Sequence, residues 1–443
     1  MKSFGRFVVI ALLVFALLQL ARPRIPAKPV TAEIQASPQV RQILRNDCYS
    51  CHSDERRLAW FDQIVPGYWL VRHDILTARQ HLNFSTLGSQ PPAVQRATLF
   101  EAVNMIQLGA MPLPSFTKLH PDARVTTEDL ATLKARLAPW TPFPNPPPSQ
   151  PVPAIALDSV KLEFNNLSFD PSFETWKPIS TTDRGDNNTF RFILGNDIAV
   201  KAAQSGNITP WPDGSRFAKI AWQQTFSADG LMHPGNFVQV ELMVKDAARY
   251  KQTEGWGWGR WRSLNLAPYG KNAAFVSECT SCHLPVRGND YVYTLPMTQA
   301  IVARDEAANN KAAALPSTLP WQPLTWNAIT MYVDPSRHTT ATLYGNQPAI
   351  QALHVPGPTA TQPPAYPAGA VLALVTWSQR DDPHWFGARI PDAPQSVEFV
   401  QISPPGRTTT YRRFAGPALT EASTSNSDQR IQFIVGLPPA SLP

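Results

Sequence analysis

Several features that are common in proteins of this length are scarce in the sequence. Charged residues make up only 16% of the 443 residues, and the net charge of +6 is spread along the chain without a Lys/Arg block. This distribution argues against a nucleic-acid-binding patch; it either favours small neutral or anionic molecules and an acidic redox partner, or has no binding role. No apolar run reaches the roughly 20 residues that cross a bilayer comfortably. Cysteine is limited to four residues and histidine to nine.

Proline, by contrast, is abundant at 45 residues and favours loops, edge strands and linkers. At the N-terminus, Lys2 and Arg6 precede an apolar run over residues 7–20, the pattern of a secretory signal. Arg22 and Pro23 follow this run in place of a small-residue cleavage site. Residues 1–24 are therefore expected to be a cleaved signal peptide or a retained anchor. Either way the protein is exported to the periplasm, soluble or tethered to the inner membrane.

All four cysteines fall in two motifs, Cys48-Tyr49-Ser50-Cys51-His52 and Cys279-Thr280-Ser281-Cys282-His283. This pattern is typical of c-type haem attachment. Two thiols, spaced on one face of a helical turn, add to the two vinyl groups of one haem, and the adjacent histidine binds the iron. The sequence therefore predicts two covalently bound c-type haems, with His52 and His283 as iron ligands.

Two other readings of the cysteines stay open. Two distant Cys-x-x-Cys pairs can form one four-thiolate zinc site. They can also form two disulfide or redox pairs, although no thioredoxin-like βαβ pattern surrounds them. Export favours haem, because c-type attachment is completed outside the bacterial cytoplasm.

Residues 31–140 are predicted to form a helical c-type haem domain. Apolar residues recur at helical spacing before the first motif and after Pro91-Pro92, and a third helix opens at Thr126 with Asp129 as an approximate capping box. Met111, in a loop before this last helix, is the expected sixth ligand of the first haem. The alternatives are that Met111 is a core residue and that His73 is the ligand.

A Pro-rich linker is predicted at residues 141–154, and short alternating strands follow it. In the segment 216–222 this alternation places Phe217, Lys219 and Ala221 on one side. In the segment 237–245 it places Phe237, Gln239, Glu241 and Met243 on one face. The Gly-Trp run at residues 255–261 indicates a strand packed closely against a flat ligand such as a porphyrin, or an ordinary aromatic core strand.

The chain also contains an internal repeat. Residues 193–196, 212–222 and 240–241 match residues 343–346, 367–377 and 397–398. The second copy has no Cys-x-x-Cys-His motif, Lys219 is replaced by Leu374, and Arg191 is replaced by Ala341. Glu241 is kept as Glu398, which leaves its role ambiguous. We therefore expect a haem-carrying β domain at residues 155–300 and a haem-free repeat at residues 320–443.

Residues 158–295 resemble the cytochrome P-460 family. The resemblance rests on Arg191, Asp213-Gly214-x4-Lys219, Glu241-x3-Lys245-Asp246, the Gly-Trp strand, and the second haem motif followed by Asp290-Tyr291-Val292. It implies a β-sheet fold, a five-coordinate haem, a lysine bonded to the porphyrin edge at the position of Lys219, and a pocket arginine and glutamate at Arg191 and Glu241. Members of the family oxidise hydroxylamine, and related members only bind NO.

Residues 40–140 look like a bacterial haem-binding domain that is often joined to an anchor. The motifs that carry this second resemblance are Asn46-Asp47-Cys48, Trp69-Leu70-Val71-x-His73, Arg79-x-x-Leu82-Asn83-Phe84-Ser85 and Met111-Pro112. Together the two resemblances imply an α+β multidomain protein, with a helical cytochrome c-like domain followed by two antiparallel P-460-like domains. Because the simple family forms homodimers, the second repeat is expected to replace the second subunit in an intramolecular pseudo-dimer.

The expected function is oxidation of hydroxylamine or NO at the second haem. Glu241 would act as a base whose pKa is raised by burial, assisted by Arg191 and Lys219. Electrons would pass to the first haem, held by His52 and Met111, and then to a redox partner protein or a quinone-linked acceptor. The alternative is an NO-binding or electron-transfer protein without turnover. A peroxide-reducing dihaem enzyme is a weaker reading, because no distal histidine lies near the second motif.

Overall fold

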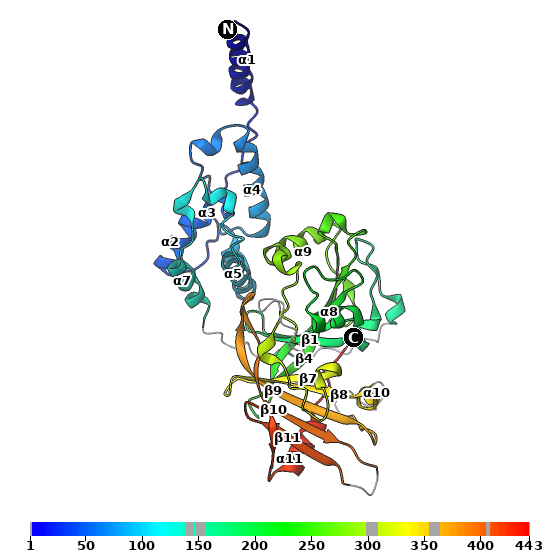
Figure 1. Cartoon of the computed structure of the whole chain (residues 1–443). Helices are drawn as coiled ribbons and strands as arrows, with labels where there is room; N and C mark the ends of the chain where they lie inside the picture. The colour runs from blue at the N-terminus through cyan, green and yellow to red at the C-terminus, as the bar shows by residue number, and fades with distance from the viewer. Residues whose placement is uncertain are drawn as a thin grey trace. The chain divides into compact units, whose positions relative to one another are not determined.

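The computed structural model describes residues 2–138, 145–147, 156–297, 309–353, 364–404 and 408–442. The chain divides into two compact units, Met1–Trp140 and Thr141–Pro443. Figure 1 colours the first unit blue to cyan and the second from green to red. Apart from residues 145–147, the predicted Pro-rich linker at 141–154 lies outside the described residues.

The first unit is helical, as predicted. Its helix α7 begins after Thr126, whose hydroxyl accepts from the Asp129 amide while the Asp129 carboxylate accepts from the Thr126 amide, and so completes the predicted capping box. The helix α5 begins directly after Pro91. The helices are α1 Lys2–Leu18, α2 Pro38–Asp47, α3 Tyr49–His52, α4 Gly67–His81, α5 Pro92–Gln107, α6 Pro114–Thr117 and α7 Thr127–Leu137.

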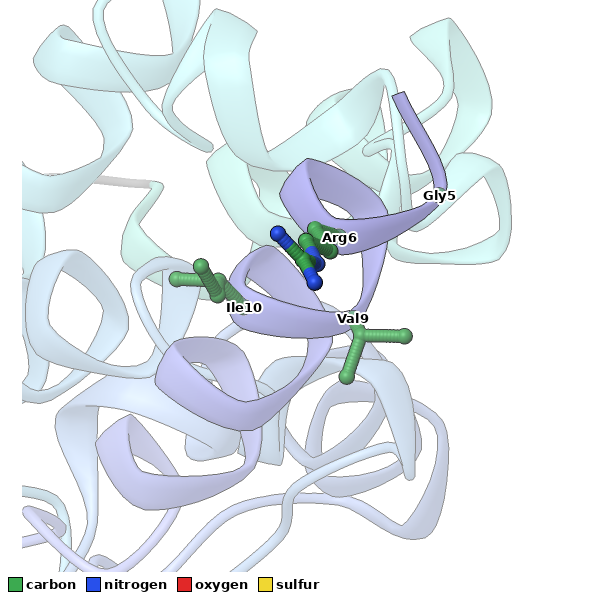
Figure 2. A pocket seen from close by; sticks show the side chains of 4 residues that line it. All are labelled: Gly5, Arg6, Val9 and Ile10. Carbon is green, nitrogen blue, oxygen red and sulfur yellow. The ribbon is translucent and has the colours of Figure 1, made fainter. Parts of the chain in front are cut away.

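The N-terminal helix α1 exposes apolar side chains along its whole length, including Phe7, Leu12 and Leu17 at 62% or more exposure. A shallow hollow on α1 is lined by Gly5, Arg6, Val9 and Ile10 (Figure 2). It contains none of the predicted site residues. Among the described helices, none combines the length and the apolar character needed to cross a membrane.

The second unit is built on one antiparallel sheet of 12 strands. Its strands are β1 Lys177–Arg184, β2 Thr189–Gly195, β3 Arg216–Phe226, β4 Met232–Lys245, β5 Trp256–Arg262, β6 Ala267–Pro268, β7 Asn327–Asp334, β8 Thr339–Gly345, β9 Val371–Asp382, β10 Trp385–Gln401, β11 Thr410–Ala415 and β12 Thr420–Ala422. Its helices are α8 Asp197–Ser205, α9 Phe275–His283, α10 Gln347–Leu353 and α11 Ser427–Gly436.

The sheet joins the two repeats into one body. Strands follow the order β1-β2-β3-β4-β7-β8-β9-β10, and a pairing of β1 with β10 closes this path on itself. The expectation of two separate β domains was therefore wrong, because both repeats contribute strands to a single sheet and share one compact unit. Closure leaves neither repeat with an unpaired edge at β1 or β10.

The two repeats have matching local geometry. Lys177 pairs with Gly195 in the first copy and Asn327 pairs with Gly345 in the second, each followed by a β-bulge. A Cβ on Gly195 would lie 3.2 Å from the Cβ of Ala199, and one on Gly345 would clash with Ala349 at 2.9 Å. These glycines therefore let the following helix approach the strand closely.

The strand register confirms the alignment of the two repeats at the positions of Lys219 and Glu241. In the first copy Lys219 pairs with Ile193 on one side and with Glu241 on the other. In the second copy Leu374 pairs with Leu343 and Glu398. Leu374 thus occupies the place of Lys219, and Glu398 that of Glu241.

The predicted face of β4 needs one correction. Val240 and Leu242 point into the core as expected, but Phe237 joins them there and does not share a face with Glu241. The β3–β4 register shifts between Ala221 and Trp222, so that Ala221 opposes Gln239 while Trp222 opposes Phe237. The extra residue of this bulge breaks the alternation that the sequence analysis assumed.

In the second repeat, the strand face equivalent to that of Lys219 is filled by protein. Leu374 and Ala341 are fully buried there, against Ile434 of α11. Glu398, only 3% exposed, binds the Arg430 guanidinium through two hydrogen bonds of 2.8 and 2.6 Å and accepts a third from Tyr411. The helix α11, which follows β12 as α9 follows β6, therefore occupies this face and supplies the cation that the buried glutamate needs.

Replacing that cation should destabilise the fold. Arg430→Met leaves Glu398 buried without a counter-charge, and we expect the free energy of unfolding to fall by roughly 2–4 kcal/mol, because Arg430 itself is partly exposed. Urea unfolding measures this. Arg412→Met is the matched control: it breaks a two-bond pair with Glu421 that is exposed to solvent, and should lower the free energy of unfolding far less. Equal losses of unfolding free energy in the two variants would contradict the pairing of Glu398 with Arg430 as a stabilising interaction.

Candidate haem sites

The first Cys-x-x-Cys-His motif forms a helical turn in the first unit. Cys48 precedes α3, and its carbonyl accepts from the amides of Cys51 and His52 at 3.2 and 2.9 Å. The Nδ1 of His52 lies 3.0 Å from the carbonyl oxygen of Leu82. Because a carbonyl can only accept, Nδ1 carries the proton and Nε2 the lone pair. His52 is therefore in the tautomer that binds iron through Nε2.

The two predicted sixth ligands of this site differ in exposure. Met111 is half-buried in the loop after α5, where its amide donates to the Met105 carbonyl at 3.1 Å. His73 is exposed on α4. A thioether already held in a partly buried loop loses less freedom on binding iron than an exposed imidazole does. Met111 therefore stays the favoured prediction.

The second motif ends helix α9, where Cys279 and Cys282 lie one turn apart and His283 is the last residue. The Nδ1 of His283 donates to the carbonyl oxygen of Tyr291 at 2.7 Å, so this histidine has the same tautomer as His52. Asp290 and Tyr291 both have positive φ angles, of 46° and 65°. This unusual backbone turns the Tyr291 carbonyl toward the imidazole.

A buried ion pair fixes that turn. Lys245 of β4 contacts Asp290 at 2.8 Å, and both side chains are at most 10% exposed. The Asp290 carboxylate also accepts from the Trp211 amide, and its carbonyl accepts from the Trp256 indole, both at 2.9 Å. The ion pair between Lys245 and Asp290 therefore orients His283 indirectly, through the Tyr291 carbonyl that accepts from its ring.

Burial keeps the ligands of the second motif uncharged. It lowers the pKa of His283 to about 4, so the imidazole is neutral at pH 7 and can bind a metal. It raises the pKa of Cys279 to about 12, and that of Cys48 to about 12 in the other unit. Among the described residues, no group of three or more Cys, His, Asp or Glu is placed to hold a metal ion.

Charged side chains gather on the strand face beside His283. The Lys219 ammonium on β3 lies 2.5 Å from Glu241 on β4, and Arg260 on β5 lies 3.3 Å from the same carboxylate. The register sets this row, because Lys219 opposes Glu241 and Glu241 opposes Arg260. All three charges influence the pKa of His283, so the row lies close to the predicted iron ligand.

Arg191 completes the group from β2. Burial and the neighbouring Arg184 lower the pKa of its guanidinium to about 9, and Glu241 acts against them. The buried Nε atom of Arg191 has no hydrogen-bond partner among the described residues. The Nε atom of Arg260 is the one that pairs with Glu241. Three cations thus surround one carboxylate, Glu241. This excess of positive charge, with an unpaired donor on Arg191, fits a bound group that carries carboxylates, as the propionates of haem do.

The same surroundings shift the pKa of the two central residues. Burial lowers the pKa of Lys219 to about 8, although Glu241 opposes this shift. Burial alone would raise the pKa of Glu241, but Arg260, Lys219 and Arg191 together outweigh it and hold the pKa well below its usual range. The prediction of a raised pKa for Glu241 was therefore wrong for this arrangement, because it did not include Arg260.

The Gly-Trp strand separates its small and large residues between two faces. A Cβ on Gly257 would clash with Tyr250 at 2.4 Å, and one on Gly259 with the Trp261 ring at 2.7 Å. These glycines therefore make room for protein side chains on the core face. Trp258 lies on the opposite face, with its ring centroid 4.5 Å from that of His283. The large residue, and not the glycines, lies against His283, the predicted iron ligand.

Several site residues were missed at the sequence level. Arg260 could have been found, because strand alternation places it two residues after Trp258 on the same face. Tyr293 packs edge-on to His283 at 5.0 Å and donates to the Cys282 carbonyl at 2.6 Å. His384 and Trp385 come from the second repeat, and no local signal in the sequence links them to this site.

Comparison with protein families gives two matches. Residues 171–294 match the family described as cytochrome P460, and residues 7–138 match the family described as haem-binding domain. The search of curated proteins gave no match. The two matches confirm the predicted two-part architecture, and together they indicate a haem cytochrome.

The ligand set of the first site can be tested by one substitution. Met111→Leu should lower the reduction potential of the first haem, because methionine ligation raises the potential of histidine-ligated iron. His73→Ala should leave that potential unchanged. Redox titration followed by absorption measures both variants. A changed potential with His73→Ala, together with an unchanged one with Met111→Leu, would reverse the assignment.

Proposed function

We propose that this haem-binding and cytochrome P460 chain is a dihaem c-type cytochrome that oxidises hydroxylamine, or a related small nitrogen compound such as NO, at its second site. Electrons then pass to the first site and on to a redox partner protein or a quinone-linked acceptor. Cys279, Cys282 and His283 would hold one haem, and Cys48, Cys51 and His52 the other. A bound haem supplies an iron that takes up the electrons of the substrate.

The observation that carries this proposal is the row Lys219–Glu241–Arg260 beside His283. A buried carboxylate within 2.5 Å of an amine and 3.3 Å of a guanidinium is an arrangement for handling protons and charge. A protein that only transfers electrons would not need such a row, since two axial ligands are sufficient for that role.

Glu241 is assigned the role of base, and its low pKa must then rise when the site matures. Lys219 is one of the cations that lower this pKa. A bond from the Lys219 nitrogen to the porphyrin edge, as the resemblance implies, would replace one N–H and one porphyrin C–H, with two electrons and two protons passing to an external oxidant such as a peroxide. The bonded nitrogen would then carry no positive charge beside Glu241, and loss of a neighbouring cation raises the pKa of a carboxylate. The pKa of about 8 for Lys219 also leaves a larger fraction of neutral, nucleophilic amine than an ordinary lysine has.

Arg191 and Arg260 remain as cations after that change. The unpaired Nε atom of Arg191 can donate to an anionic group bound near His283. Both arginines also keep Glu241 ionised at pH 7 between turnovers, which a proton acceptor requires. Lys219, Arg191 and Glu241 are therefore the proposed catalytic residues, with Arg260 added by the structure.

The second repeat is proposed to be a P-460-like copy that has lost its haem. Three differences support this. Lys219 is replaced by Leu374, Arg191 by Ala341, and the place of α9 is taken by α11, which has no cysteine. The closed strand path supports the further proposal that the copy replaces the second subunit of a dimer.

A second candidate function is NO binding or simple electron transfer without turnover. The lowered pKa of Glu241 favours this alternative, since a strongly ion-paired carboxylate is a weak base. Turnover of the wild-type protein and of a Glu241 variant distinguishes the two candidate functions.

Glu241→Gln should reduce kcat for hydroxylamine by roughly 10²–10⁴-fold, the usual contribution of a general base. Glu398→Gln is the matched control, because it changes the glutamate at the same register of the second repeat and should leave kcat unchanged. Steady-state oxidation with an artificial electron acceptor measures both variants. If wild-type protein carrying both haems shows no turnover, the NO-binding alternative replaces the enzyme.

We also propose that the N-terminal helix stays attached and tethers the protein to the inner membrane, with both units in the periplasm. The segment directly after α1 is built into the first unit. The Gln19 amide exchanges two hydrogen bonds, of 3.1 and 2.9 Å, with the backbone of Val65, and the Trp69 indole donates to the Ala21 carbonyl at 2.7 Å. Ile25 is 7% exposed and packs with Val65.

Mass spectrometry of the mature N-terminus tests this proposal. Cleavage after the apolar run would remove Gln19 and its contacts, so we expect the peptide spanning Gln19 to be present and the protein to sediment with membranes. A variant in which a cleavable export signal replaces residues 2–18 should be released from the membrane with both haems attached. A mature N-terminus beyond Ala21 would rule out the tether.

A further inference from the structure

The hairpin between β9 and β10 belongs to the second repeat but lies against the haem site of the first. Strand β10 pairs with β1 at Asp183 and Arg184, next to the end of β1. The Asp186 amide donates to the Gly387 carbonyl at 3.2 Å. The tip of this hairpin is therefore held by backbone pairing and not only by side chains.

A buried aspartate fastens the two repeats together at this point. Asp183, 7% exposed, accepts from Gln224 of β3 at 2.6 Å and from Gln379 of β9 at 3.0 Å. These glutamines come two residues after Trp222 and Trp377, which match each other in the repeat. The Asp183 carboxylate thus accepts a hydrogen bond from the corresponding glutamine of each copy.

The side chains at the tip reach the packing partner of the iron ligand. Trp385 lies 5.4 Å from the ring of Tyr293, which is itself 5.0 Å from the ring of His283. His384 lies 2.7 Å from the Tyr293 carbonyl through its Nδ1, so that nitrogen donates. The second repeat therefore holds Tyr293 by both its ring and its backbone.

Trp385 also contacts the charged side of the site. The Arg184 guanidinium lies 4.3 Å above its ring, and its indole donates to Asp186 at 3.3 Å. Arg184 and Asp186 form a buried ion pair, and both influence the pKa of Arg191. One side chain thus connects the residue packed on His283 with the group that surrounds Arg191.

We propose that Trp385 is a positioning residue for the second haem site, and that the haem-free repeat contributes the hairpin that completes this site. Trp385 keeps Tyr293 packed on His283 and orders Arg184 and Asp186 beside Arg191. The inference rests on the haem-binding part of the proposed function and is independent of hydroxylamine turnover. It assigns the second repeat a role beyond closing the sheet.

The reduction potential of each haem tests the proposal in the full-length protein carrying both haems. Trp385→Ala opens the apolar packing around His283 to water, which favours the more highly charged oxidised iron and lowers the potential. We expect a lower potential at the second haem only, with the first haem as an internal reference. Trp385→Phe keeps a ring against Tyr293 and should restore most of the potential.

A matched control comes from the corresponding hairpin of the first repeat. There His233 packs on Tyr332 of the haem-free half at 5.8 Å. His233→Ala should leave both potentials unchanged. If Trp385→Ala does not fold, Trp385→Leu replaces it, since leucine is apolar but has no ring. An unchanged second potential in folded Trp385→Ala, or identical potentials in the Phe and Leu variants, would overturn the proposal, whether or not the protein oxidises hydroxylamine.

Discussion

The need to pair buried charges governs the arrangement of the second haem site. Glu241 lies in the middle of a closed sheet, where an ionised carboxylate is costly unless cations surround it. Lys219, Arg260 and Arg191 meet this need from the neighbouring strands. The second repeat faces the same constraint at Glu398 and meets it with Arg430 of α11. The same register position therefore carries a glutamate in both copies, within a charged site in the first and within a filled core in the second.

Sharing one sheet makes the two copies interdependent. The segment after the first copy crosses to the second, where the Ala313 carbonyl accepts from the Trp377 indole at 3.0 Å. The end of the second copy crosses back, and the Ser441 carbonyl accepts from the Trp222 indole at 2.5 Å. This reciprocal exchange, with the shared contact at Asp183, ties the copy without a haem motif into the same folded unit.

Much of this organisation was predictable from sequence. The Thr126 capping box and the matching of Lys219 with Leu374 depend on local pattern or spacing, and the structure agrees with both. The shared sheet, the bulge that turns Phe237 inward and the contact of Trp385 with Tyr293 depend on pairing between distant segments. The pKa of Glu241 was mispredicted for the same reason, since Arg260 reaches it across a strand pairing. The assignment of Met111 and the roles of Arg191, Lys219 and Glu241 stay predictions.

The central claim is that the second haem site is chemically different from the first, and that Lys219 makes it so. Mass spectrometry of proteolytic peptides from the mature protein tests this most directly. The peptide carrying Lys219 should be recovered bonded to the same haem as Cys279 and Cys282, while the haem of Cys48 and Cys51 should have no third attachment. An unmodified Lys219 in protein with both haems attached would contradict this claim.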